Sequence, residues 1–192
     1  MSIHYVSRSD YRKTHTDDFI DKLKEKFGNF YLVPEGGANE LAVKGAQEIL
    51  DKNDTQDFVC TAIGTGCTIA GIVNSSKNQM VLGFPAIKGS EDLEKDITMW
   101  TTKQNWKLIS DYHFGGYSKI SEELIQFIMD FYQKHNIPLD AIYTGKIMFG
   151  IFDLIKKDYF PKGSKILAIH TGGLQSNIGF NGRFGLNLPH NF

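Results

Sequence analysis

The chain of 192 residues has few cysteines, no long apolar run and no excess of positive or negative charge. Its two cysteines, Cys60 and Cys67, cannot form a disulfide framework and match no zinc-binding spacing, so we expect no metal site and a reducing, cytoplasmic environment. The sequence contains no run of about eighteen apolar residues, so we expect no membrane span. Residues 1–8 lack the apolar segment of a signal peptide. With 21 Lys and Arg against 22 Asp and Glu, nothing indicates nucleic-acid binding.

The chain does contain an alternation of apolar strand patterns and amphipathic helix patterns. The strand patterns fall at 3–6, 30–33, 58–63, 80–84, 106–109 and 165–170, and the helix patterns at 16–27, 39–50, from about 68, 91–102, 121–135 and 147–157. The expected inner face of the helix at 39–50 consists of Leu41, Val43, Ala46, Ile49 and Leu50. This alternation predicts an α/β fold, a doubly wound three-layer sandwich with a mostly parallel sheet.

In such folds ligands bind beyond the carboxyl ends of the strands. The segment 64–68, Gly-Thr-Gly-Cys-Thr, follows the most apolar strand pattern and leads into a helix start. Backbone N–H groups and hydroxyls there suit a phosphate group. The segment is neither a P-loop nor a dinucleotide-binding glycine motif, and the alternative is a tight turn with no ligand. For Cys67 the alternatives are a side chain that is small for packing and a reactive thiol.

Other candidate residues leave two interpretations open. Gly36 and Gly37 either permit a turn after Pro34 or let a ligand ring approach the backbone. Tyr117 and Tyr143 are either packing residues or proton donors. His170 ends an apolar strand and is more often a hydrogen-bonded core residue than a catalyst. Lys44 and Lys146 are the lysines to weigh for a Schiff base, and the spacing supports neither.

Five segments resemble, in sequence and in order, the 1-aminocyclopropane-1-carboxylate deaminase / D-cysteine desulfhydrase family. They are residues 34–39, 65–71, 116–117, 143–146 and 169–173. The resemblance covers nearly the whole chain and implies enzymes that use pyridoxal 5′-phosphate (PLP) on the fold of the tryptophan synthase β subunit. It also implies that residues 1–34 are a remnant of the smaller domain and that residues 35–192 form the larger, cofactor-binding domain.

The resemblance implies a role for each candidate residue. Thr65, Gly66, Cys67 and Thr68 would bind the cofactor phosphate, and Gly36 and Gly37 would lie beside its ring. The Thr171 hydroxyl would meet the pyridine nitrogen, leave it largely unprotonated and so moderate the electron sink. Tyr117 and Tyr143 would be the tyrosines on the substrate side. Thr171 favours the desulfhydrase branch over the deaminase branch.

One departure from the family is large. The Schiff-base lysine of the family lies in a Gly-Gly-Asn-Lys motif, followed by a Ser-Asn-His segment, and neither occurs in this sequence. We therefore expect a chain that lacks the family's N-terminal part and does not complete the reaction alone. The first hypothesis is part of a PLP-dependent deaminase or desulfhydrase, a homodimer acting on a small amino acid. The alternative is a non-catalytic domain that binds a phosphate ligand or a partner chain.

Overall fold

The computed structural model describes residues 2–89 and 91–190 and divides into two compact units, Met1–Ala38 and Asn39–Phe192. The first unit contains α1 (Arg8–Tyr11), α2 (Asp17–Phe27) and the short 3₁₀ helix η1 (Glu35–Gly37). As expected, α2 follows Thr16 and ends at Gly28. None of the described residues of this unit is buried, so it has no hydrophobic core of its own. Whether it corresponds to a remnant of a smaller domain stays a prediction.

Two predicted strands, at 3–6 and 30–33, are wrong. Both segments are irregular, and Tyr31 is 69% exposed. A strand is stabilised by hydrogen bonds to a neighbouring strand, and residues 2–38 contain no strand. Apolar composition therefore did not suffice to form one.

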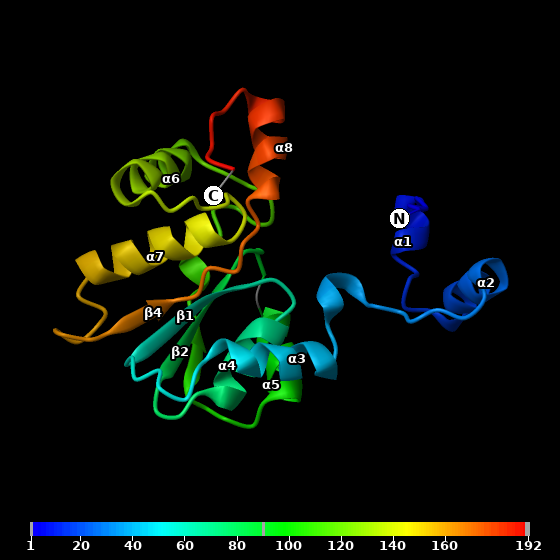
Figure 1. Ribbon diagram of the computed structural model, residues 1–192, viewed down its shortest axis with the longest axis horizontal. Helices are drawn as coiled ribbons and strands as arrows, with labels where there is room; N and C mark the ends of the chain where they lie inside the picture. The colour runs from blue at the N-terminus through cyan, green and yellow to red at the C-terminus, as the bar shows by residue number, and fades with distance from the viewer. Residues whose placement is uncertain (1, 90, 191–192) are drawn as a thin grey trace. The chain divides into compact units, whose positions relative to one another are not determined.

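The second unit is built on a sheet of four parallel strands (Figure 1). They are β1 (Phe58–Ile63), β2 (Met80–Pro85), β3 (Trp106–Leu108) and β4 (Ile166–Ala168), in the order β3-β2-β1-β4. At the centre of the sheet, Cys60 lies opposite Leu82 on one side and Ala168 on the other. Burial raises the pKa of the Cys60 thiol to about 12, as expected for a small core residue. Among the described residues, no helix is long and apolar enough to cross a membrane.

Helices cover both faces of the sheet, which confirms the three-layer α/β sandwich (Figure 1). One face packs against α4 (Cys67–Ser75) and α5 (Glu91–Trp100), and α3 (Glu40–Ala46) packs on α4. The other face packs against α7 (Thr144–Lys156), which in turn contacts α6 (Glu122–His135). The remaining elements are the 3₁₀ helices η2 (Gln47–Ile49) and η3 (Ser110–Tyr112) and the helix α8 (Gln175–Phe184). The sequence pattern predicts neither η3 nor α8.

The inner face expected for residues 39–50 is correct only in part. Val43 and Leu50 are buried, but Leu41 is 66% exposed and Ile49 is also exposed. The α-helix ends at Ala46 and continues as η2, whose tighter winding changes the direction of each later side chain. An uninterrupted α-helical period therefore placed Ile49 on the wrong side.

Candidate functional site

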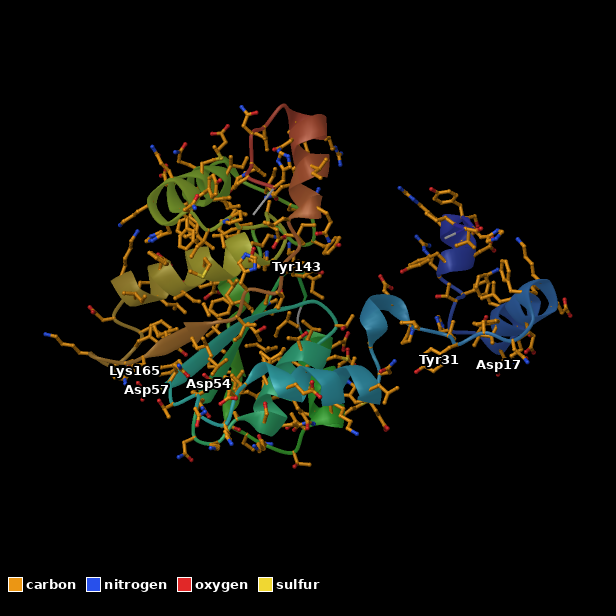
Figure 2. The ribbon with its side chains drawn as sticks, in the orientation of Figure 1. Asp17, Tyr31, Asp54, Asp57, Tyr143 and Lys165 are labelled. Carbon is orange, nitrogen blue, oxygen red and sulfur yellow. The ribbon has the colours of Figure 1, made fainter. Side chains whose placement is uncertain are left out.

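The candidate site lies at the carboxyl ends of the strands in the second unit, where three loops meet the start of α7. The loops are 64–66 after β1, 109–117 after β3 and 169–173 after β4. Figure 2 shows Tyr143 at the N-terminal end of α7, while Asp57 and Lys165 mark the opposite end of the sheet. There the Lys165 N–H donates to the Asp57 carboxylate at 2.7 Å.

The start of α4 presents backbone donors that the helix does not use. Gly66 caps the helix with φ 93° and, having no side chain, leaves the cap without a side-chain acceptor. The N–H of Ala70 donates to the Gly66 carbonyl at 3.0 Å, so the N–H groups of Cys67, Thr68 and Ile69 precede the first helical bond. These donors sit at the positive end of the helix dipole, which favours an anion.

Gly64 and Gly66 lie tightly against neighbouring side chains. A Cβ atom at Gly64 would lie 3.2 Å from the Tyr143 Oη atom, and one at Gly66 would lie 3.1 Å from the Ile97 Cγ1 atom. Within residues 2–89 and 91–190, the hydroxyls of Thr65 and Thr68 take part in no hydrogen bond. Both residues are half-buried. The loop thus brings donors, free hydroxyls and the Tyr143 phenol to one place.

Tyr117 and Tyr143, both predicted substrate-side residues, pack against each other. Their ring centroids are 6.1 Å apart and the rings are inclined by 66°. Tyr143 is half-buried, while Tyr117 is 55% exposed. The structure therefore brings the two tyrosine rings together and places the Tyr143 phenol beside Gly64.

Asp140, which the sequence reasoning missed, holds the turn that carries Tyr143. Its fully buried carboxylate accepts hydrogen bonds from the N–H groups of Ile142, Tyr143 and Thr144 at 2.7–2.9 Å and from the Thr144 hydroxyl at 2.8 Å. A Cβ atom at Gly173 would lie 3.1 Å from the Asp140 Cγ atom, so the loop after β4 reaches the same turn. An Asp four residues before a Thr at a helix start was the signal that could have revealed this cap.

Asn177 on α8 supports the same turn from the other side. Its Oδ1 atom accepts from the Ala141 N–H at 3.1 Å, and its Nδ2 atom donates to the Leu139 carbonyl at 2.9 Å. Asn177 is fully buried. No local sequence pattern distinguishes it from other asparagines.

The segment after β4 is more exposed than predicted. Thr171 and His170 are both exposed, because β4 is an edge strand with no neighbour beyond it among the described residues. The Gly172 N–H donates to His170 Nδ1 at 3.1 Å, and His170 Nε2 lies 2.8 Å from the Pro138 carbonyl. These contacts assign the neutral Nε2–H tautomer to His170. His170 is hydrogen-bonded as expected, but it does not lie in the core.

The other candidates fall in three places. Gly36 and Gly37 lie in η1 of the first unit with φ of 63° and 69°, and their predicted position beside a ring stays a prediction. Cys67 is buried in the first turn of α4, and Lys44 is exposed on α3. Within the described residues, no group of three or more His, Cys, Asp or Glu could hold a metal ion.

Lys146, one helical turn after Tyr143, is 2% exposed. Its Nζ atom donates to the backbone carbonyls of His113 at 2.9 Å and Gly116 at 2.8 Å. Burial lowers the pKa of Lys146 to about 8, and the nearby Asp140 charge opposes this shift. The amine is thus bound to backbone oxygens, which does not favour a Schiff base.

Comparisons with known proteins identify relatives of this chain. No protein-family profile matches the chain. The chain is 30% identical, over 186 residues, to a Pyrococcus furiosus protein provisionally named a 1-aminocyclopropane-1-carboxylate deaminase, covering 85% of this chain and 56% of that protein. It is 28% identical to a 1-aminocyclopropane-1-carboxylate deaminase of Rhizobium rhizogenes, over 85% of this chain and 56% of that enzyme.

A plant relative and a solved structure extend the likeness. The chain is 27% identical to the mitochondrial bifunctional D-cysteine desulfhydrase/1-aminocyclopropane-1-carboxylate deaminase of Arabidopsis thaliana, over 90% of this chain and 50% of that enzyme. A crystal structure of an ACC deaminase homologue superposes with a TM-score of 0.71 at 25% identity, over 88% of this chain and 57% of the homologue. The chain, which spans about half the length of these relatives, belongs to the 1-aminocyclopropane-1-carboxylate deaminase / D-cysteine desulfhydrase family.

Proposed function

We propose that this chain supplies the cofactor-phosphate site and the substrate-side tyrosines of a PLP-dependent enzyme. The family depends on PLP, and the substrate class we propose is a small amino acid such as D-cysteine or 1-aminocyclopropane-1-carboxylate. The products would be ammonia and a 2-oxo acid, with sulfide from D-cysteine. The observation that carries the proposal is the start of α4, where unused N–H groups follow the Gly64 loop that the Tyr143 phenol contacts.

The residues present suit the parts of the cofactor. The N–H groups of Cys67 and Thr68 and the hydroxyls of Thr65 and Thr68 would bind the phosphate, because Gly66 lets an anion approach the backbone. The Thr171 hydroxyl would donate to the unprotonated ring nitrogen. Bound PLP supplies an electron sink for the bonds at the substrate α-carbon.

The tyrosines would act on the substrate side. A phenol can hold or transfer a proton at a substrate heteroatom within hydrogen-bonding reach. Tyr143 is held by the Asp140 cap and lies against Gly64, whereas Tyr117 is more exposed. We assign Tyr143 to the cofactor end of the site and Tyr117 to the solvent end.

We further propose that the 192 residues alone bind without turnover. The sequence contains no Gly-Gly-Asn-Lys segment, and the Lys146 amine is bound to two carbonyls. With added PLP and D-cysteine, we expect no sulfide release. Sulfide release by this chain would contradict this part of the proposal.

Calorimetric titration with pyridoxine 5′-phosphate tests the binding site. This compound lacks the aldehyde of PLP, so it cannot react with the surface lysines. We expect binding, and we expect Thr68→Val to weaken it about tenfold because one hydrogen bond to a charged phosphate is lost. The control is Thr102→Val, at an exposed position on the loop after α5.

Two outcomes of this titration would contradict the proposal. One is equal affinity of the two variants, and the other is no binding at millimolar ligand. If inorganic phosphate bound as tightly as pyridoxine phosphate, the alternative of a general phosphate-binding domain would be favoured, because the ring would then contribute nothing.

A further inference from the structure

Lys146 has a role that the cofactor site does not account for. It is one of the few charged side chains that are buried in the second unit, and its Nζ atom binds the carbonyl oxygens of His113 and Gly116. Burying an ammonium group is costly unless hydrogen bonds compensate it. The two carbonyls provide that compensation, so Lys146 connects α7 to the loop 113–117 that follows η3.

The loop 113–117 needs an external support. Phe114, Gly115 and Gly116 have φ of 53°, 92° and 118°, and Ser118 follows with 54°. Two of these four are not glycine, and left-handed backbone is unfavourable for such residues. Inside the loop, the Gly115 N–H donates to His113 Nδ1 at 2.8 Å and the Gly116 N–H to the His113 carbonyl at 3.0 Å.

The loop ends at Tyr117, whose ring packs on Tyr143. Tyr143 is the N-cap residue of α7, and Lys146 follows in the first turn of that helix. The start of α7 therefore contacts the loop at two points, the ammonium group at the His113 and Gly116 carbonyls and the Tyr143 ring at Tyr117.

We propose that Lys146 is a positioning residue that fixes the loop 113–117 on α7 and thereby sets the position of the Tyr117 phenol relative to Tyr143. The substrate-side role of the two phenols rests on the proposed function, whereas the fixation of the loop by Lys146 does not. Asp140 supports the role, since its charge favours the protonated amine that donates to both carbonyls.

Fluorine NMR of the chain labelled with 3-fluorotyrosine tests this role without any ligand. The chain has eight tyrosines, and Tyr→Phe variants assign their signals. In Lys146→Met we expect the Tyr117 and Tyr143 signals to shift by more than their line widths and the Tyr117 signal to broaden. The Tyr132 signal, from α6, should stay in place and show that the fold is intact.

The matched control is Lys156→Met, at an exposed position on the same helix. It should leave the Tyr117 and Tyr143 signals unchanged. Lys146→Arg, which keeps donors for both carbonyls, should restore the Tyr117 signal toward its original position. Unchanged Tyr117 and Tyr143 signals in folded Lys146→Met would overturn the proposal. Because no ligand is present, failure here is distinct from failure of the cofactor proposal.

Amide hydrogen exchange on the unsubstituted chain covers the case in which Lys146→Met does not fold. The N–H groups of Gly116 and Lys119 donate to backbone carbonyls within this segment. If Lys146 fixes the loop, these amides should exchange as slowly as those of the first turns of α7. Exchange at the rate of an unstructured loop would overturn the proposal.

Discussion

At the scale of single residues, the site is organised by buried polar side chains rather than by the tyrosines themselves. Asp140, Lys146 and Asn177 each bind backbone groups of the segments that carry Tyr117 and Tyr143. Removing one of these side chains should cost stability, because the backbone groups that it binds would be left buried without a partner. Substitution of Asp140 or Lys146 should therefore change the free energy of unfolding.

Asp140→Asn should destabilise the second unit by about 3 kcal/mol, because an amide cannot accept the four hydrogen bonds that the carboxylate accepts. Urea unfolding followed by circular dichroism measures this loss. The control is Asp130→Asn, at an exposed position on α6, where we expect a change within about 0.5 kcal/mol. Equal effects of the two variants would contradict the role of Asp140 as a cap.

Lys146 should make stability depend on pH. Its pKa is about 8 in the folded chain, against 10.5 for an ordinary lysine exposed to water, as in the unfolded chain. Between these values the unfolded state binds more protons, so the free energy of unfolding rises with pH. We expect the stability of the unsubstituted chain, relative to Lys146→Met, to increase by about 2 kcal/mol from about pH 7.5 to about pH 10. A difference that stays constant with pH would show that the pKa is not lowered.

At the scale of elements, the packing of α3 on α4 depends on a missing side chain. A Cβ atom at Gly71 would lie 2.6 Å from the Val43 carbonyl and closer still to the Ala46 side chain. The two helices approach so closely only because α4 has glycine at this position. Gly71 lies in α4, whose start carries the proposed phosphate site.

Gly71→Ala should therefore cost about 2 kcal/mol of stability through overpacking. Gly45→Ala, on α3, is the matched control, because a Cβ atom there meets nothing within 4 Å. Removing a helical glycine at that position should be neutral or stabilising by up to about 1 kcal/mol. Thermal unfolding of both variants measures the contrast, and the same melting temperature for both would contradict it.

At the scale of the whole molecule, apolar side chains stay exposed in the second unit. On α8, Ile178 is 58% and Phe184 is 50% exposed, and Phe184 lines a hollow of about 300 Å³ together with Ile142 and Phe180. The edge strand β4 is also only half-buried on both faces. Exposed apolar side chains can mark an interaction site, and we propose self-association as a homodimer through α8.

Sedimentation velocity at micromolar concentration tests this proposal. We expect a dimer of the unsubstituted chain and a monomer for the double variant Ile178→Lys, Phe184→Lys, because two buried positive charges on each side would oppose the contact. The control is Met99→Lys, at an exposed apolar position on α5. A monomeric unsubstituted chain, or a dimer that persists in the double variant, would contradict the assignment to α8.

Much of the second unit follows from local pattern. The strand at Phe58–Ile63 matches its predicted bounds, since a buried parallel strand is apolar at nearly every position. The helix α6 begins after Ser121 and ends at Asn136, as capping chemistry predicts. By contrast, α8 contains Asn181, Gly179 and Gly182 and has no strong amphipathic pattern, so only its contacts explain it.

The amino-acid sequence by itself determined the α/β alternation, the parallel sheet and the family, because strand periodicity, caps and ordered motifs are local properties of the chain. Only the tertiary structure decided that the segments 3–6 and 30–33 are not strands, that β4 is an edge, and that Tyr143 contacts both Tyr117 and Gly64. These features depend on which segments become neighbours in space. Contacts between residues as distant in sequence as Lys146 and His113 have no local signature, since their hydrogen bonds exist only after the sheet has formed.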